Sequence, residues 1–209
     1  WIDALSHWGY DATQRRNLGG SPAPVDYSSE ALVDTKPDHR KGLTPEFATA
    51  NALHDDEQAA HWRRLGFTMH LVAPEGGYLT GQSALISLSG RPSRETIIRS
   101  PVALHGGFVS VPGADYPRSR MGEVAHVRQM FLDAGHHQRL WQNYQKNGRQ
   151  GRQPPVDAAL QALAPVLDKQ LPWVVEADSQ DEILRALSLA DEFGIRPIIF
   201  GGREAYKVA

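Results

Sequence analysis

Residues 171–209 read LPWVVEADSQDEILRALSLADEFGIRPIIFGGREAYKVA, and this stretch decides the fold class. An apolar run over 172–177 predicts a strand, and 179–194 carries the spacing of an amphipathic helix that stops at a glycine. A second apolar strand over 196–200 follows, and 201–209 begins a further helix. Apolar strands of this kind are typical of a parallel sheet whose two faces are covered by helices. The chain is therefore predicted to be α/β, although periodicity alone does not separate a barrel from an open sheet.

The rest of the chain carries weaker signals of the same kind. Residues 1–7 predict a first strand, 9–46 a long ordered loop, and the glycine-rich 74–82 a tight turn. The other expected helices are 44–66, 119–135 with Gly135 as its end, 136–147 and 156–170, and the other expected strands are 67–74, 83–90 and 102–105.

Composition and charge exclude several classes of protein. The 209 residues are 41% hydrophobic and 22% charged, with a net charge of −2 and no cysteine. This balance predicts a globular domain without disulfides or thiolate metal sites, and without a basic surface for nucleic acid. No apolar run reaches the roughly 20 residues of a membrane span. We expect residues 1–209 to be one segment of a longer protein, incomplete at both ends, and no feature fixes its compartment.

Polar side chains follow the expected strands, at the ends where ligands gather in α/β proteins. The stretch IDALSHWG, residues 2–9, places His7 there, with Leu5 on the same face. A histidine in place of Leu5 would complete an H-x-H metal clamp, so a lone His7 is either a metal ligand or a hydrogen-bonded structural residue. His105 and Glu204 also follow strands and are candidates for a substrate pocket.

Glu176 and Asp178 lie two residues apart at the end of the strand over 172–177. Two carboxylates on one face can hold a metal or act as acid and base. The alternative is that Asp178 or Ser179 caps the helix that follows. Glu176 is the candidate metal ligand, because a carboxylate that closes an apolar strand needs a partner if it is buried. Asp178 is a candidate pocket residue.

Other histidines and one basic run have structural explanations. His70 alternates with apolar residues and is expected in the core or an interface, whereas His136 and His137 follow an expected helix end and should lie at the surface. The run KNGRQGRQPP, residues 146–155, is expected to be a solvated loop, with phosphate or an acidic partner as the alternative ligand.

Several of these stretches resemble the amidohydrolase superfamily. IDALSHWG resembles its first-strand signature D-x-H-x-H-x-G, and residues 63–90 and 116–134 resemble the following elements of imidazolonepropionase-like and related bacterial branches. Residues 171–209 are the most specific match. The resemblance implies a TIM-like (β/α)8 barrel, with about six of its strands in this chain. The remaining strands would come from further sequence or from another chain.

The resemblance also implies a chemistry. One or two divalent metals, zinc in the first place, would activate a water that hydrolyses a non-peptide or peptide-like C–N bond of a small molecule. The sequence departs from this pattern at the ligands. Leu5 and His7 stand at the first-strand pair, Glu176 and Asp178 at the strand-five pair, and Gly201 at the strand-six histidine. The metal ligands implied are His7 and Glu176, at a site remodelled around them.

Two alternatives stand beside a divergent metal hydrolase. One is a catalytically degenerate scaffold or binding module without metal, in which Arg203 or Arg128 would neutralise Glu176. The other is an unrelated open α/β domain that binds a small ligand, which strand order would distinguish from a barrel.

Overall fold

The computed structural model describes residues 2–6 by their backbone and residues 40, 42–53, 58–91, 95–108, 117 and 119–208 in detail. His7 and most of the expected loop over 9–46 lie outside the described residues. The strands are β1 (Ile2–Ser6), β2 (Met69–Val72), β3 (Leu79–Gln82), β4 (Ala84–Ser87), β5 (Ile97–Arg99), β6 (Leu104–Gly107), β7 (Trp173–Ala177) and β8 (Pro197–Gly201). The helices are η2 (Thr49–Asn51), α3 (Gln58–Arg64), α4 (Arg120–Lys146), α5 (Ala158–Leu167), α6 (Gln180–Phe193) and η4 (Ala205–Lys207).

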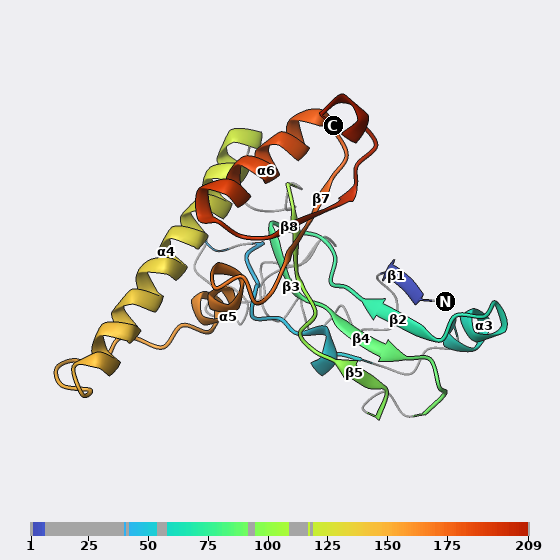
Figure 1. The fold of residues 1–209 in the computed structure, drawn as a ribbon, viewed down its shortest axis with the longest axis horizontal. Coiled ribbons are helices and arrows are strands. Elements are labelled where there is room, and N and C mark those ends of the chain that lie inside the picture. Colours follow the sequence, from blue (N-terminus) through green and yellow to red (C-terminus); the bar gives the residue numbers. More distant parts are fainter. Residues whose placement is uncertain are drawn as a thin grey trace, which may run out of the picture.

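The described strands form two four-stranded sheets, ordered β1-β2-β4-β5 and β3-β6-β7-β8. In the second sheet β6, β7 and β8 are parallel neighbours in chain order, and β3 runs antiparallel to β6. Figure 1 shows α4, α5 and α6 gathered at this second sheet, while α3 lies at the far end of the other sheet. The α/β prediction is confirmed. The two sheets are not closed into a complete barrel within the described residues.

The β7–α6–β8 unit forms as the sequence predicts. Ser179 begins α6 with a capping box: its hydroxyl accepts from the backbone N–H of Glu182, and the Glu182 carboxylate accepts from the backbone N–H of Ser179. Gly194 ends the helix in the left-handed region, at φ 62°. The local signals and the tertiary structure therefore agree in this unit.

Helices cover one face of the second sheet. Leu104, Trp173 and Val175 point to that face and are buried in one core with residues of α4, α5 and α6. The opposite face carries Ile198 and Phe200, which remain 49% and 38% exposed. The expectation that helices cover both faces is therefore wrong for the described residues.

Gly135 does not end a helix, contrary to the sequence prediction. α4 runs through it for 27 residues, from Arg120 to Lys146, because packing against α5 and α6 outweighs the low helix propensity of one glycine. The continued helix turns His137 inward, where it is buried, so its expected surface position is also wrong. Nε2 of His137 lies 2.9 Å from the carbonyl oxygen of Pro155 and accepts from Nε1 of Trp141 at 3.0 Å.

Short elements account for the other differences. The expected turn over 74–82 contains β3, and β5 follows β4 where no strand was predicted. The expected helix over 44–66 is reduced to η2 and α3 among the described residues, and 201–209 forms only η4. Strands of three or four residues carry almost no periodic signal, and their pairing partners determine them.

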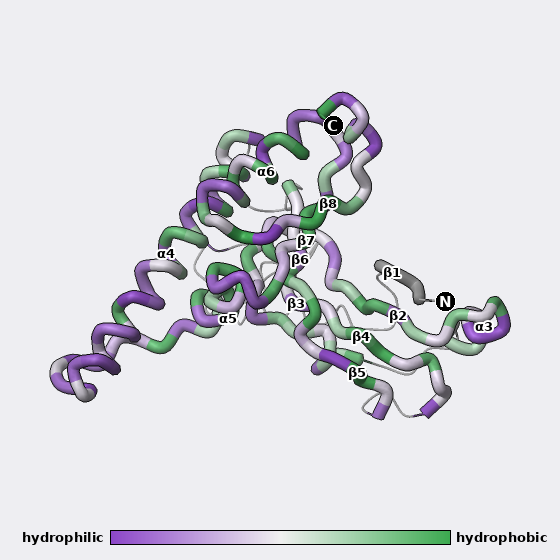
Figure 2. The backbone as a smooth tube through the Cα atoms, viewed as in Figure 1, coloured by the Kyte–Doolittle hydropathy of each residue, from purple (hydrophilic) through white to green (hydrophobic). Residues whose placement is uncertain are grey.

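None of the helices in the described part of the chain is both long and apolar enough to cross a bilayer. Figure 2 shows why α4 does not qualify despite its length: the end that extends away from the sheets is hydrophilic.

Candidate functional site

Strand register places Glu176 between Gly107 and Phe200, whose side chains cannot bind a metal. Glu176 on β7 pairs with Gly107 on β6 and with Phe200 on β8. Register partners in parallel strands point to the same face of the sheet. This row lies at the carboxyl ends of the strands, on the face opposite the helices.

A second row lies two residues earlier on the same three strands. Val174 on β7 pairs with His105 on β6 and Ile198 on β8. Because residues two apart share a face, His105 and Glu176 lie on one face of adjacent strands. The structure thus brings together two candidate residues that are 71 positions apart in the sequence.

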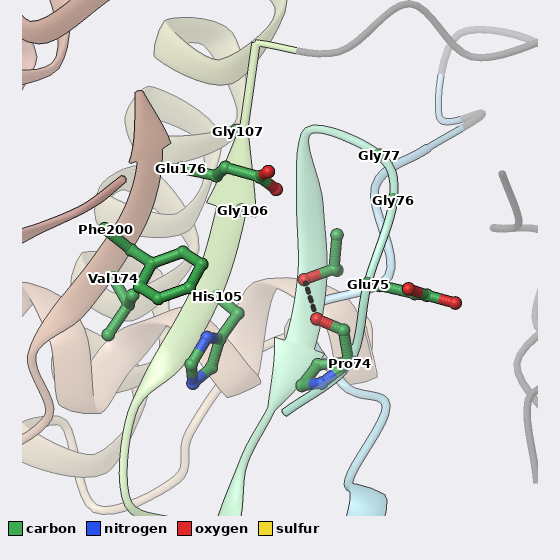
Figure 3. A pocket seen from close by; sticks show the side chains of 11 residues that line it. Pro74, Glu75, Gly76, Gly77, His105, Gly106, Gly107, Val174, Glu176 and Phe200 are labelled. Carbon is green, nitrogen blue, oxygen red and sulfur yellow. Dashed lines mark hydrogen bonds between the residues drawn. The ribbon is translucent and has the colours of Figure 1, made fainter. Parts of the chain in front are cut away.

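A small pocket opens beside these rows, against the turn that precedes β3 (Figure 3). Its lining residues are Pro74, Glu75, Gly76, Gly77, Thr80, His105, Gly106, Gly107, Val174, Glu176 and Phe200. Figure 3 shows the Glu176 carboxylate reaching toward the space between β6 and this turn, whereas Glu75 points outward. The pocket is small, with room for one or two water molecules.

Glycines allow the pocket walls to approach each other. A Cβ atom on Gly106 would lie 2.1 Å from the carbonyl oxygen of Tyr78, so β6 and β3 can pair this closely only with glycine there. Gly76 and Gly77 take φ values of 68° and 102°, which the turn requires and which other residues rarely adopt. Backbone therefore forms much of the wall, and few side chains provide its chemistry.

The two predicted residues differ in their surroundings. His105 is buried, at 4% exposure, whereas Glu176 is exposed. Glu176 takes part in none of the hydrogen bonds or ion pairs recorded among the described residues. The arginines proposed as its partners pair elsewhere: Nε of Arg203 donates to Asp178 at 2.9 Å, and Nε of Arg128 donates to Glu192 at 2.8 Å. The prediction that Arg203 or Arg128 neutralises Glu176 is wrong.

Asp178 and Glu204 lie at a second pocket, around the start of α6, together with Ser179, Glu182 and Arg203. Glu204 accepts from the backbone N–H of Gln180 at 2.9 Å and from Lys207 at 2.7 Å. These two hydrogen bonds hold the pKa of Glu204 below its ordinary value of 4.5. Ser179, and not Asp178, caps the helix.

Glu182 belongs to the same cluster. Burial alone would raise the pKa of its carboxyl, but the backbone N–H groups of Ser179 and Asp178 and the charge of Arg120 outweigh burial and lower it. Nη2 of Arg120 lies 3.0 Å from the Glu182 carboxylate and ties α4 to α6. The carboxylates of this cluster already accept from backbone and cationic donors, so the cluster anchors the helix.

The described residues do not fit the metal centre that the resemblance implies. No group of three or more histidine or acidic side chains in the described part of the chain can hold a metal ion. Gly201 pairs with Ala177 and therefore falls on the face opposite Glu176, so Phe200 is the β8 neighbour of Glu176. Neither residue can ligate through its side chain. Leu5 cannot ligate either, and His7 lies outside the described residues.

Sequence reasoning missed two residues that matter here. In the sequence Phe200 is only the end of an apolar strand, whereas its pairing with Glu176 in the structure places it at the pocket. Arg120 begins α4 and reaches the carboxylates of Glu123 at 3.2 Å and Glu182 at 3.0 Å. Strand register decides the position of Phe200, and helix packing decides that of Arg120. The sequence indicated Phe200 only by its place at the end of a strand.

Comparison with known proteins supports a relationship at the level of the fold. No protein-family model and no curated protein sequence matches the chain. Among solved structures, an amidohydrolase from Thermotoga maritima MSB8 superposes with a TM-score of 0.76 at 25% sequence identity. The match covers 100% of this chain and 52% of that protein, so the chain spans about half its length. Over the part compared, the chain therefore shares the fold of that amidohydrolase.

Proposed function

We propose that this chain is part of a divergent amidohydrolase-like protein whose strand-end pocket binds a small molecule without the metal centre of the family. The observation that carries the proposal is the row Gly107, Glu176 and Phe200. A metal at this position needs several imidazole or carboxylate ligands, and Glu176 has a glycine and a phenyl ring on its two sides. A pocket with one carboxylate, a buried histidine and a ring remains suited to binding an organic ligand.

A metal-dependent hydrolase acting on a non-peptide or peptide-like C–N bond is the second candidate. It is favoured by the placement of His105 and Glu176 on one face at one pocket. It would need His7 and residues beyond the described ones to complete a site, and the coarse likeness to an amidohydrolase supports the reaction class. The two candidates differ in one measurable quantity, the metal bound per chain.

The test is elemental analysis of the longest natural form of the protein, after incubation with zinc and removal of excess ion. We expect well below one equivalent of zinc, manganese or iron, unchanged in the Glu176→Gln variant. The control variant is Glu95→Gln, which removes an exposed carboxylate that does not line the pocket. One or two equivalents of metal that disappear in His7→Ala or Glu176→Gln would reject the proposal. Hydrolysis assays on cyclic amides and dipeptides would then follow.

A further inference from the structure

The pocket at the ends of β6 and β7 carries negative charge. Of the two glutamates that line it, only Glu176 directs its carboxylate into the pocket, because Glu75 points outward (Figure 3), and no lysine or arginine is among the described residues that line it. Glu176 is engaged in no ion pair within the described part of the chain, and its carboxylate faces the pocket (Figure 3). A ligand with positive charge would therefore gain an electrostatic attraction that a neutral or anionic ligand would not.

An aromatic ring stands beside this carboxylate. Phe200 is the register partner of Glu176, and its ring lines the same pocket. Phenyl rings attract cations through their faces, and organic cations with an apolar body also gain by covering apolar surface. The pairing of one carboxylate with one ring is suited to an organic cation and not to a bare metal ion, which would need more oxygen or nitrogen ligands.

The size of the pocket and the apolar surface at its mouth restrict the ligand further. The space suffices for a head group of about the size of one or two waters. Phe200 lines the pocket and is 38% exposed, and Ile198, two residues earlier on the same face of β8, is 49% exposed. A ligand with a small charged head group and a short apolar tail would place the head group in the pocket and the tail on Phe200 and Ile198.

We infer that this pocket binds a small organic cation, a primary ammonium compound with a short apolar tail. The ammonium group donates to the carboxylate of Glu176, and the tail packs on Phe200 and Ile198. The inference rests on the proposed function, because a metal at Glu176 would occupy the same carboxylate.

The experiment compares three probes of equal chain length and different charge: n-butylammonium, 1-butanol and butyrate. Each is titrated at neutral pH into the longest natural form of the protein, and binding is followed by NMR chemical shifts. We expect n-butylammonium to bind tightest. Glu176→Gln should weaken its affinity about tenfold and leave 1-butanol unchanged. Phe200→Leu keeps an apolar side chain and should weaken n-butylammonium more than 1-butanol. Glu95→Gln is the control and should change neither.

The outcomes separate this inference from the proposed function. Equal or tighter binding of 1-butanol or butyrate would overturn the cationic ligand and leave a small-molecule pocket standing. An n-butylammonium affinity that Glu176→Gln does not change, or no binding of any probe to metal-free protein, would also overturn it. A stoichiometric metal that is lost in Glu176→Gln would instead overturn the proposed function, and this inference with it.

Discussion

Asp178, directly after β7, and Arg203, shortly after β8, form an ion pair: Oδ2 of Asp178 accepts from Nε of Arg203 at 2.9 Å. The Asp178 carboxylate turns toward the strand that follows α6, where a Cβ atom on Gly201 would lie 2.6 Å from its Oδ1. A side chain at position 201 would therefore meet this carboxylate unless the Asp178 side chain moved away.

Gly201→Ala should destabilise the protein by about 1–3 kcal/mol, since φ at this position is 93° and the new methyl group meets Asp178. The measurement is the free energy of unfolding in urea. Gly148→Ala is the matched control: φ is 64° and nothing lies within 4 Å of the new Cβ, so it should cost only the backbone strain of about 1 kcal/mol.

A double substitution checks the cause. In an Asp178→Ala background the methyl group no longer meets a carboxylate, so Gly201→Ala should cost about as much as Gly148→Ala does. If Gly201→Ala and Gly148→Ala cost the same in the unmodified background, Asp178 swings aside freely and the steric argument fails.

Gly106→Ala should be more damaging than Gly201→Ala or Gly148→Ala. The new Cβ would lie 2.1 Å from the backbone carbonyl oxygen of Tyr78, so β3 would have to separate from β6. We expect a loss above about 3 kcal/mol, or failure to fold. Gly135→Ala is the control inside α4, where the nearest atom is 3.6 Å away, and it should stabilise by about 0.5–1 kcal/mol. The measurement is the midpoint temperature of thermal unfolding of both variants and of the parent protein. A small decrease in this temperature for Gly106→Ala would contradict the predicted clash with Tyr78.

The β7–α6–β8 unit was predictable because its signals are local. The stretch after Glu176 contains Ser179 and Glu182 at the spacing of a capping box, and Gly194 ends the helical pattern. Side chains and backbone within one helix turn satisfy these rules without help from the rest of the chain. The resemblance to the amidohydrolase superfamily was likewise most specific in this segment, although it also drew on residues 2–9, 63–90 and 116–134.

The pocket was less predictable because register decides it. Whether Phe200 or Gly201 stands beside Glu176 depends on a shift of a single residue, which moves every side chain of β8 to the other face. His105 was found by its place after a strand, but β3, whose pairing with Gly106 closes the wall, has only four residues and no periodic pattern. Such contacts arise only when the sheet assembles.

The Glu182 capping box should make stability depend on pH on the acidic side. The pKa of Glu182 is lower in the folded chain than its ordinary value of 4.5, which is the value we take for the unfolded chain. The ionised carboxylate therefore stabilises the fold above about pH 4.5, and this stabilisation is lost as the pH falls through the folded pKa. Glu182→Gln should lower the free energy of unfolding by about 0.5–2 kcal/mol at pH 7 and reduce its pH dependence between about pH 5 and 3.

Urea unfolding at a series of pH values measures both effects. Ser179→Ala removes the other half of the capping box without removing a charge, so it should cost about 1 kcal/mol with a smaller change in the pH dependence. Glu95→Gln is the control for the loss of an exposed carboxylate and should change neither quantity appreciably. A Glu182→Gln variant that loses stability equally at pH 3 and pH 7 would show that packing, and not the ionised carboxylate, is what Glu182 contributes to α6.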